Sequence, residues 1–174
     1  MRLLSALVRA RRRTGVRRGR GVCVGRGVRF DVAAGAQLVL GDGCRIGERT
    51  RIVVQAGRVE IGPGAVLGER CTLVAHCGVT IGARAQLGHG AVVVDFDHVF
   101  VDVERPIREQ ALESAPVAIG EEALIGLGAS ILRAVDVGAR AIVDPRAVVT
   151  RDVPPGGHVG GVPAKPVIAG APAP

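Results

Sequence analysis

The sequence predicts an all-β protein whose single chain winds into a solenoid shaped as a triangular prism, with one short helix before it. Three observations support this fold class. Aliphatic residues recur every six positions over most of the chain, and every insertion falls at the same place in the repeat. The 174 residues include no tryptophan, no tyrosine and only three phenylalanines. A fixed internal period indicates stacked structural units, which decide the fold as a whole.

The six-residue repeat places Ile, Leu or Val at fifteen positions. They are Leu40, Ile46, Ile52, Ile61, Leu67, Leu73, Ile81, Leu87, Val93, Ile119, Ile125, Ile131, Val137, Val143 and Val149. Four residues after each comes a small or β-branched residue, with Asp97 the one exception. A period of six fits neither a helix nor a plain strand, but it fits a short strand followed by a corner. We expect the large aliphatic residues to fill an interior too narrow for aromatic rings, and the small ones to turn the corners.

Glycine adds a longer period to the repeat. It follows the aliphatic residue in the first and second hexads of each group of three, as in Gly41 and Gly47, whereas Val53 occupies the third. Asp144 is the one exception among the glycines. Three hexads therefore make one coil of the prism, and a weaker copy at Val24 and Phe30 predicts an earlier, first coil.

The insertions lie along a single edge of the predicted prism. The step after the third hexad is 9, 8, 26 and 6 residues in successive coils, and the longest runs from Asp95 to Pro116. Insertions in a solenoid map to one face, and loops on a rigid scaffold tend to carry function. The loop 95–116 is therefore the place to look for chemistry.

The cysteines point to a reduced, cytoplasmic protein. Cys44, Cys71 and Cys77 fall at the small inward position, which predicts core packing. The four cysteines lack metal-type spacing and no export signal precedes them, so we expect free thiols and no metal site. No apolar run approaches the roughly 18 residues needed to span a bilayer.

The basic charge is concentrated at one end of the sequence. Residues 1–29 hold ten arginines and no acid, which leaves 13 basic against 16 acidic residues in the rest of the chain. We divide the chain into an arginine-rich N-terminal helix or tail (1–21), a β-helix domain (22–167) and a flexible C-terminal tail (168–174).

The N-terminal segment has three readings. Leu3, Leu4, Leu7 and Val8 have helical spacing among the arginines. A short amphipathic helix here could cap the end of the prism, or it could lie on an anionic membrane surface. Nucleic-acid binding is disfavoured, because no aromatic residues interleave the arginines for base stacking.

Beyond the hexads, the sequence carries motifs that resemble those of the hexapeptide-repeat acyltransferases. These are Asp95-Phe96-Asp97-His98, the stretch 106–110 ahead of 116–120, and the ending 149–155 followed by Gly160-Gly161-Val162-Pro163-Ala164-Lys165. The resemblance covers residues 22–167. It implies a single-stranded left-handed parallel β-helix and a homotrimer with active sites between subunits. It also implies transfer of an acetyl group from acetyl-CoA to a hydroxyl of a sugar or glycan.

His98 matches the family's catalytic histidine. Moving an acyl group from a thioester to a hydroxyl needs a base for the hydroxyl proton, and neutral imidazole suits this near neutral pH. No acyl carrier is needed, so we expect direct attack. Asp95 and Asp97 flank the histidine, and either could orient its ring. His76, one coil earlier on the insertion edge, and Glu113, on the returning side of the loop, are candidates for acceptor contact.

The resemblance also implies a set of donor contacts. Gly126 and Leu127 would line the pantetheine arm, Pro145 and Thr150 would lie nearer the nucleotide, and Arg151 with Lys165 would meet the phosphates. Fixed cations complement phosphate charge. Many relatives have tryptophan where this chain has Leu124, which is a departure in the packing around the donor or the loop.

Two other function classes remain open from the sequence. A zinc enzyme resembling γ-class carbonic anhydrases would use three histidines, but His76, His89 and His98 lack that family's close histidine pair. A non-catalytic structural β-helix is the other alternative.

Overall fold

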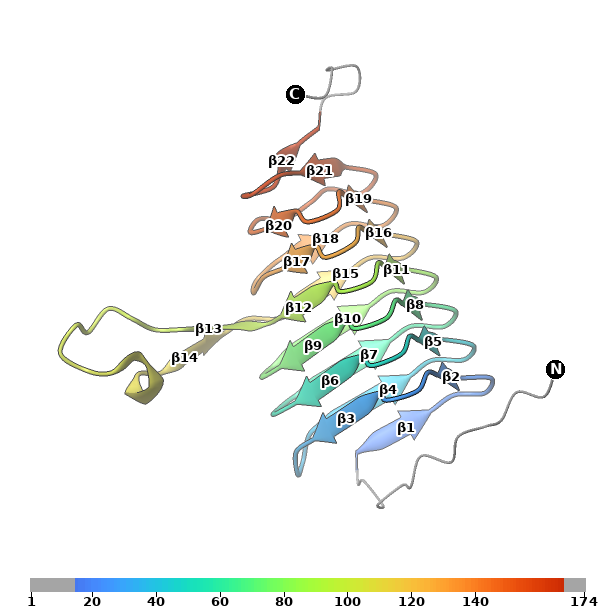
Figure 1. Ribbon diagram of the computed structural model, residues 1–174, viewed down its shortest axis with the longest axis horizontal. Helices are drawn as coiled ribbons and strands as arrows, with labels where there is room; N and C mark the ends of the chain where they lie inside the picture. Colours follow the sequence, from blue (N-terminus) through green and yellow to red (C-terminus); the bar gives the residue numbers. More distant parts are fainter. Residues whose placement is uncertain (1–14, 168–174) are drawn as a thin grey trace.

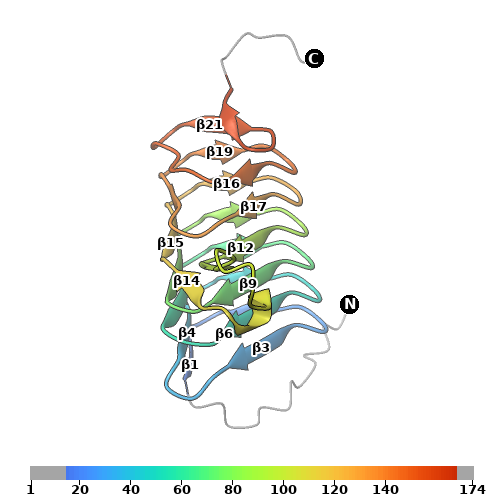
Figure 2. The ribbon, with the colours of Figure 1, turned by 90° about the vertical axis from the view of Figure 1, so that its left-hand side faces the viewer.

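The computed structural model describes residues 15–167 and confirms the parallel β-helix. Three sheets form the sides of a prism, and all their strands pair in parallel except the last strand of the second sheet, which is antiparallel to its neighbour (Figures 1 and 2). The first side contains β1 (Val16–Arg18), β4 (Gln37–Leu40), β7 (Arg58–Ile61), β10 (Gly78–Ile81), β15 (Val117–Ile119) and β18 (Asp136–Val137). The second contains β2 (Cys23–Val24), β5 (Arg45–Ile46), β8 (Val66–Leu67), β11 (Gln86–Leu87), β16 (Leu124–Ile125), β19 (Ile142–Val143), β21 (His158–Gly160) and β22 (Lys165–Pro166). The third contains β3 (Arg29–Val32), β6 (Arg51–Val54), β9 (Thr72–Ala75), β12 (Val92–Val94), β17 (Ser130–Ile131) and β20 (Val148–Val149).

The interior consists of columns of aliphatic side chains, as the six-residue repeat predicts. Down the first side, Leu40, Ile61 and Ile81 lie in register and are at most 1% exposed. Cys44 and Cys71 are buried at the corners, and burial raises the pKa of both thiols. Each coil adds its own layer of large apolar side chains to this interior, so stability is built up coil by coil through contact with neighbouring coils.

Most glycines of the repeat are required by the stacking itself. At Gly126 a Cβ atom would lie 2.4 Å from the backbone nitrogen of Pro145 in the next coil. Asp144 interrupts this column because the residue stacked beyond it is Gly160. The space that Gly160 leaves holds the Asp144 carboxylate, whose Oδ1 lies 2.7 Å from Nε2 of His158.

The insertions all fall at the corner where the chain passes from the third side to the first, here called the insertion corner. Between β12 and β15 the chain leaves the prism as a hairpin of β13 (Phe96–His98) and β14 (Leu112–Ser114), which pair antiparallel. A single 3-10 turn, η1 (Ile107–Glu109), lies near the tip. Figure 1 shows this hairpin projecting from the middle of the prism.

The β-helix begins earlier than the predicted boundary at residue 22. Val16–Arg18 already pair in parallel with Leu38–Leu40, so the first coil includes part of the predicted N-terminal segment 1–21. The predicted short helix is wrong for residues 15–21, which form this strand and turns, because their backbone hydrogen bonds go to the second coil. The rest of that helix, and the predicted tail 168–174, lie outside the described residues. Within 15–167 no helix is long and apolar enough to cross a membrane.

Candidate active site at the insertion corner

The hairpin is anchored to the prism by Asp95, whose side chain is 0% exposed. The backbone N–H of His76 donates to its Oδ1 (2.7 Å), and those of Cys77 and Gly78 donate to its Oδ2 (2.8 and 2.7 Å). Its own carbonyl accepts from the N–H of Ala115 (2.9 Å), where the chain returns to the prism. Three hydrogen bonds from backbone N–H groups offset the free-energy cost of burying this carboxylate. Asp95 therefore ties both ends of the hairpin to the preceding coil, and its described hydrogen bonds go to backbone groups rather than to His98.

The structure brings two of the predicted site histidines together through a ring that the sequence reasoning did not single out. Phe96 packs against His76 with ring centroids 4.4 Å apart, and against His98 edge-on at 6.2 Å. His76 and Phe96 are half-buried, whereas His98 is exposed. The scarcity of aromatic residues was the available signal, because Phe96 is one of only three phenylalanines. The result is an imidazole presented to solvent on an aromatic support.

Asp97 and Glu113 lie on the other face of the hairpin. They are paired across β13 and β14, while His98 is paired with Leu112, and side chains of successive strand residues point to opposite faces. Oδ1 of Asp97 accepts from the backbone N–H of His98 (2.8 Å). Glu113 forms an ion pair with Arg133 of the next coil (2.8 Å), a partner that cannot be inferred from the repeat.

Cys77 lies beside this site but has the properties of a structural thiol. It is half-buried rather than fully inward as the repeat predicts. Burial and the neighbouring Asp95 carboxylate raise its pKa above the ordinary value of 9.0. The thiol is therefore protonated at neutral pH, and the thiolate is the nucleophilic form of cysteine.

The predicted donor residues fall into two groups within one chain. Gly126 and Leu127 lie at the corner between the second and third sides, stacked against Pro145 of the next coil. Lys165 lies near the same corner. In β22 it pairs with Gly160 of β21, and Gly160 stacks on Asp144 in the column that contains Gly126. Thr150 and Arg151 lie instead at the insertion corner, after β20. Leu127 is 52% exposed, so its side chain is available for an apolar contact.

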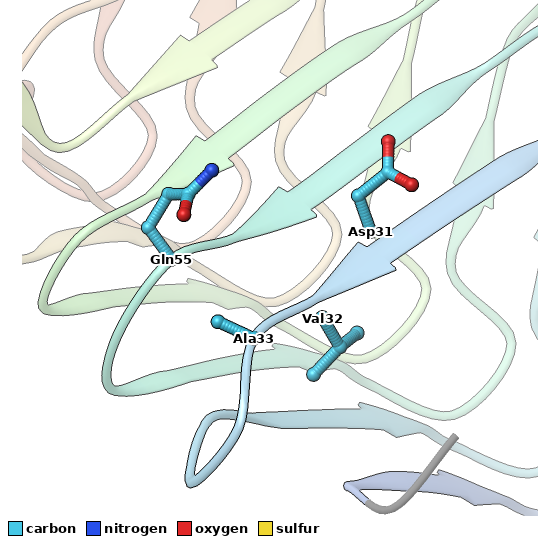
Figure 3. A pocket seen from close by; sticks show the side chains of 4 residues that line it. All are labelled: Asp31, Val32, Ala33 and Gln55. Atoms are coloured by element: carbon cyan, nitrogen blue, oxygen red, sulfur yellow. The ribbon is translucent and has the colours of Figure 1, made fainter. Parts of the chain in front are cut away.

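Other histidines and a surface depression lie apart from this cluster. His89 accepts from the backbone N–H of Glu69 (3.1 Å), and His158 pairs with Asp144. A depression of about 270 Å³ is lined by Asp31, Val32, Ala33 and Gln55 (Figure 3), at the insertion corner but in the first two coils. Within residues 15–167 no group of three His, Cys, Asp or Glu side chains is placed to hold a metal ion.

Comparison with known proteins places the chain among acetyltransferases. No protein-family model matches it. It is 31% identical over 147 residues to the probable acetyltransferase Rv3034c of Mycobacterium tuberculosis, covering 84% of this chain and 49% of that protein. It is 34% identical over 161 residues to nodulation protein L of Rhizobium meliloti, covering 77% of this chain and 84% of the relative. The chain thus spans about half the length of the mycobacterial relative and most of the rhizobial one.

Solved structures share the fold. The hexapeptide-repeat containing acetyltransferase VCA0836 of Vibrio cholerae superposes with a TM-score of 0.67 at 25% identity, covering 74% of this chain and 72% of that one. The acetyltransferase domain of PglB from Neisseria gonorrhoeae, solved with acetyl coenzyme A, gives 0.60 at 25% identity and covers 84% and 58%. The N-acyltransferase AntD of Bacillus cereus, solved with dTDP-4-amino-4,6-dideoxyglucose and coenzyme A, gives 0.75 at 17% identity, covers 86% and 81%, and shows the fold alone. From its six-residue repeat, its closing motif and these relatives, the chain belongs to the hexapeptide-repeat acetyltransferase family.

Proposed function

We propose that this chain is an acyl-CoA-dependent O-acetyltransferase that acts on a hydroxyl of a sugar or glycan, with His98 as general base. The observation that carries the proposal is the imidazole of His98, exposed at the insertion corner and supported by Phe96. Family membership supports acetyl transfer, and the PglB domain solved with acetyl coenzyme A supports acetyl-CoA as the donor.

In the proposed reaction, a ring nitrogen of His98 takes the proton of the acceptor hydroxyl as its oxygen attacks the thioester carbonyl carbon. The carbon–sulfur bond then breaks, and the CoA sulfur leaves with the proton that the imidazolium returns. Proton transfer of this kind contributes roughly 10² to 10⁴ in rate. No covalent intermediate on the enzyme is required, which agrees with the protonated state of the nearby Cys77.

The other residues of the corner receive supporting roles. His76, across Phe96 from His98, is placed to contact the acceptor. Asp97 accepts from the backbone N–H of His98 and so fixes that peptide rather than the ring. Glu113 is held by Arg133, so we assign it to positioning the hairpin from the face opposite His98. Asp95 anchors the whole arrangement.

For the donor, we propose that the pantetheine arm passes along Gly126 and Leu127, that Pro145 and Thr150 lie nearer the nucleotide, and that Lys165 and Arg151 meet phosphates. Within one chain the first three residues and His98 lie at different corners of the prism. A site assembled between neighbouring subunits of a homotrimer would bring one chain's corner to another chain's hairpin.

Exposed apolar side chains support such an assembly. On the hairpin, Phe100, Val101 and Val103 are 68%, 83% and 91% exposed in the single chain. Apolar patches of this kind mark interaction surfaces on soluble proteins. Gel filtration with light scattering is expected to give three times the mass of the 17.9 kDa chain.

We further propose a cytoplasmic location.

The proposed chemistry is tested by release of CoA thiol from acetyl-CoA in the presence of single acceptors. Hexoses and glycan fragments offer hydroxyls, whereas a dideoxy-amino sugar nucleotide offers an amine in addition. The native chain should turn over with a hydroxyl acceptor, and His98→Ala should lower the rate at least 100-fold. His89→Ala, at a surface histidine in the coil that leads into the hairpin, is the matched control and should keep the native kcat at saturating acetyl-CoA.

Each outcome of this assay bears on the proposal. Turnover only with the amine would replace O-acetylation by N-acetylation at the same site. Unchanged turnover in His98→Ala would remove the general base. No turnover with any acceptor or donor would favour the structural β-helix, and zinc-dependent hydration of CO₂ would favour the carbonic anhydrase alternative.

A further inference from the structure

The first two coils of the prism are strongly basic. Residues 15–57 hold eight arginines against three carboxylates, whereas residues 95–167 hold seven basic against eleven acidic residues. All eight arginines are exposed: Arg17, Arg18, Arg20, Arg26, Arg29, Arg45, Arg49 and Arg51. The charge therefore changes sign along the prism axis, from positive at the end with β1 to β6 (Figure 1) to negative over the hairpin and the final coils.

These arginines surround the end of the prism instead of lining one groove. Arg17 lies on the outer face of the first side, Arg45 on the second, and Arg29 with Arg51 on the third. Arg26 and Arg49 lie in adjacent coils at the corner between the second and third sides, where the N–H of Arg49 donates to the carbonyl of Arg26 (2.9 Å). Cations on all sides of one end of the prism can all approach a flat anionic surface when the prism axis is perpendicular to that surface.

The positions of three arginines work against the stability of the fold on its own. Arg18 occupies the column that later coils give to Leu40, Ile61 and Ile81 in the core. Arg29 and Arg51 lie directly opposite one another on adjacent strands, and like charges in such cross-strand pairs are destabilising.

Few carboxylates offset this charge. Among the described residues the ion pairs of this region are Arg20 with Asp42 and Arg51 with Asp31, both at 3.5 Å. The other six arginines have no ion-pair partner within the described part of the chain, so an external anion would relieve their repulsion.

We propose that the first two coils form a docking surface for an anionic phospholipid membrane, on which the prism stands on its basic end. Juxtaposed arginines bind acidic lipid headgroups through charge within a Debye length of the surface. Residues 1–14 add five arginines and the aliphatic residues Leu3, Leu4, Leu7 and Val8, a composition suited to the same interface. Nucleic acid is the poorer fit, because base stacking needs exposed rings and Phe30, the only aromatic residue in 15–57, packs against the core. The proposal does not depend on acyl transfer.

The test is co-sedimentation of the full chain with vesicles of phosphatidylcholine alone or with 30% phosphatidylglycerol added. The native chain should bind only the anionic vesicles and be released by 0.5 M salt. Combining Arg29→Gln, Arg45→Gln and Arg49→Gln should lower partitioning about 10- to 100-fold. The matched control combines Arg70→Gln, Arg140→Gln and Arg146→Gln, which removes the same charge from later coils and should change partitioning less than threefold. Circular dichroism and gel filtration check that both variants fold.

Three results would overturn the proposal. Equal losses in the two triple variants would show that net charge and not the first two coils determines binding. Full binding by the first variant would assign any membrane contact to residues 1–14 alone. Displacement of the chain from anionic vesicles by an equal charge concentration of oligonucleotide, with tighter binding to the oligonucleotide, would make nucleic acid the partner.

Discussion

In the stacked coils the large aliphatic side chains point inward and are almost fully buried, whereas in the hairpin 95–116 they are exposed. Ile125 lies in the stacked coils, here called the body, and is 0% exposed, whereas Ile107 in the hairpin is 55% exposed. The body repeats one pattern of contacts between neighbouring coils, while the hairpin depends on a few individual contacts made by Asp95, Phe96 and Glu113. Stability is therefore distributed over the coils, and the position of the proposed catalytic group depends on single residues.

The largest expected effect is on the stability of the body. Replacing Ile125 with alanine removes buried methyl groups from a stacked layer and should lower the free energy of unfolding by about 2–5 kcal/mol. The matched change Ile107→Ala in the hairpin should cost less than about 0.5 kcal/mol. Urea denaturation of both variants measures the difference, and similar losses of stability would contradict the conclusion that the coils and not the hairpin stabilise the fold.

The next effect concerns the anchor between the two regions. Asp95→Asn replaces one acceptor oxygen with an NH₂ group that faces the backbone N–H donors of residues 76–78. It should lower the free energy of unfolding by about 1–3 kcal/mol. Amide exchange at residues 76–78 and 96–99 should become faster, and acyl transfer should fall with it. The control is Asp152→Asn, because that exposed carboxylate accepts only the N–H of Asp136 (2.9 Å) among its described partners. If exchange in the hairpin stays unchanged in Asp95→Asn, Asp95 is not the anchor.

A glycine substitution separates stacking from ligand approach. Gly126→Ala places a Cβ atom against the backbone of Pro145, and overpacking of this kind costs about 1–3 kcal/mol. Gly78→Ala, whose new Cβ would have its nearest neighbour at 3.7 Å, should fold with nearly native stability. Thermal unfolding compares the two. A stable Gly126→Ala variant with weakened acetyl-CoA binding would assign this glycine to the donor instead of the stack.

The smallest effect is expected on the site alone. Phe96→Leu should lower kcat/KM roughly tenfold, about 1.4 kcal/mol in transition-state stabilisation, with little change in Tm. Phe96→Tyr restores the ring and should return activity to within threefold. Phe30→Leu in the first coil is the control, and should lower Tm while leaving kcat/KM unchanged. Parallel losses of Tm and activity in Phe96→Leu would show a structural role only.

The sequence predicted the periodic part of this molecule well, because each hexad repeats the same requirement. The inward columns, the corner residues Cys44 and Cys71, and the insertion corner all follow from spacing. The contacts of the hairpin could not be predicted in this way, because they join residues far apart in the sequence without any period. The bonds from Asp95 to the backbone at 76–78 and the pairing of Glu113 with Arg133 are of this kind. The start of the first coil could not be predicted from the repeat, because Arg18 lies where the repeat requires an aliphatic residue.

The antiparallel strand β22 has a consequence for the solubility of the whole prism. A parallel solenoid leaves unpaired backbone groups at its last coil, which could accept another chain and extend into a fibre. Here Lys165–Pro166 fold back against β21, with a proline at the edge, and the N–H of Ala164 donates to the carbonyl of Val148 on the third side (2.8 Å). A strand of reversed direction that includes a proline offers the wrong hydrogen-bonding pattern to an incoming parallel coil. The closing motif that identifies the family therefore also ends the stack.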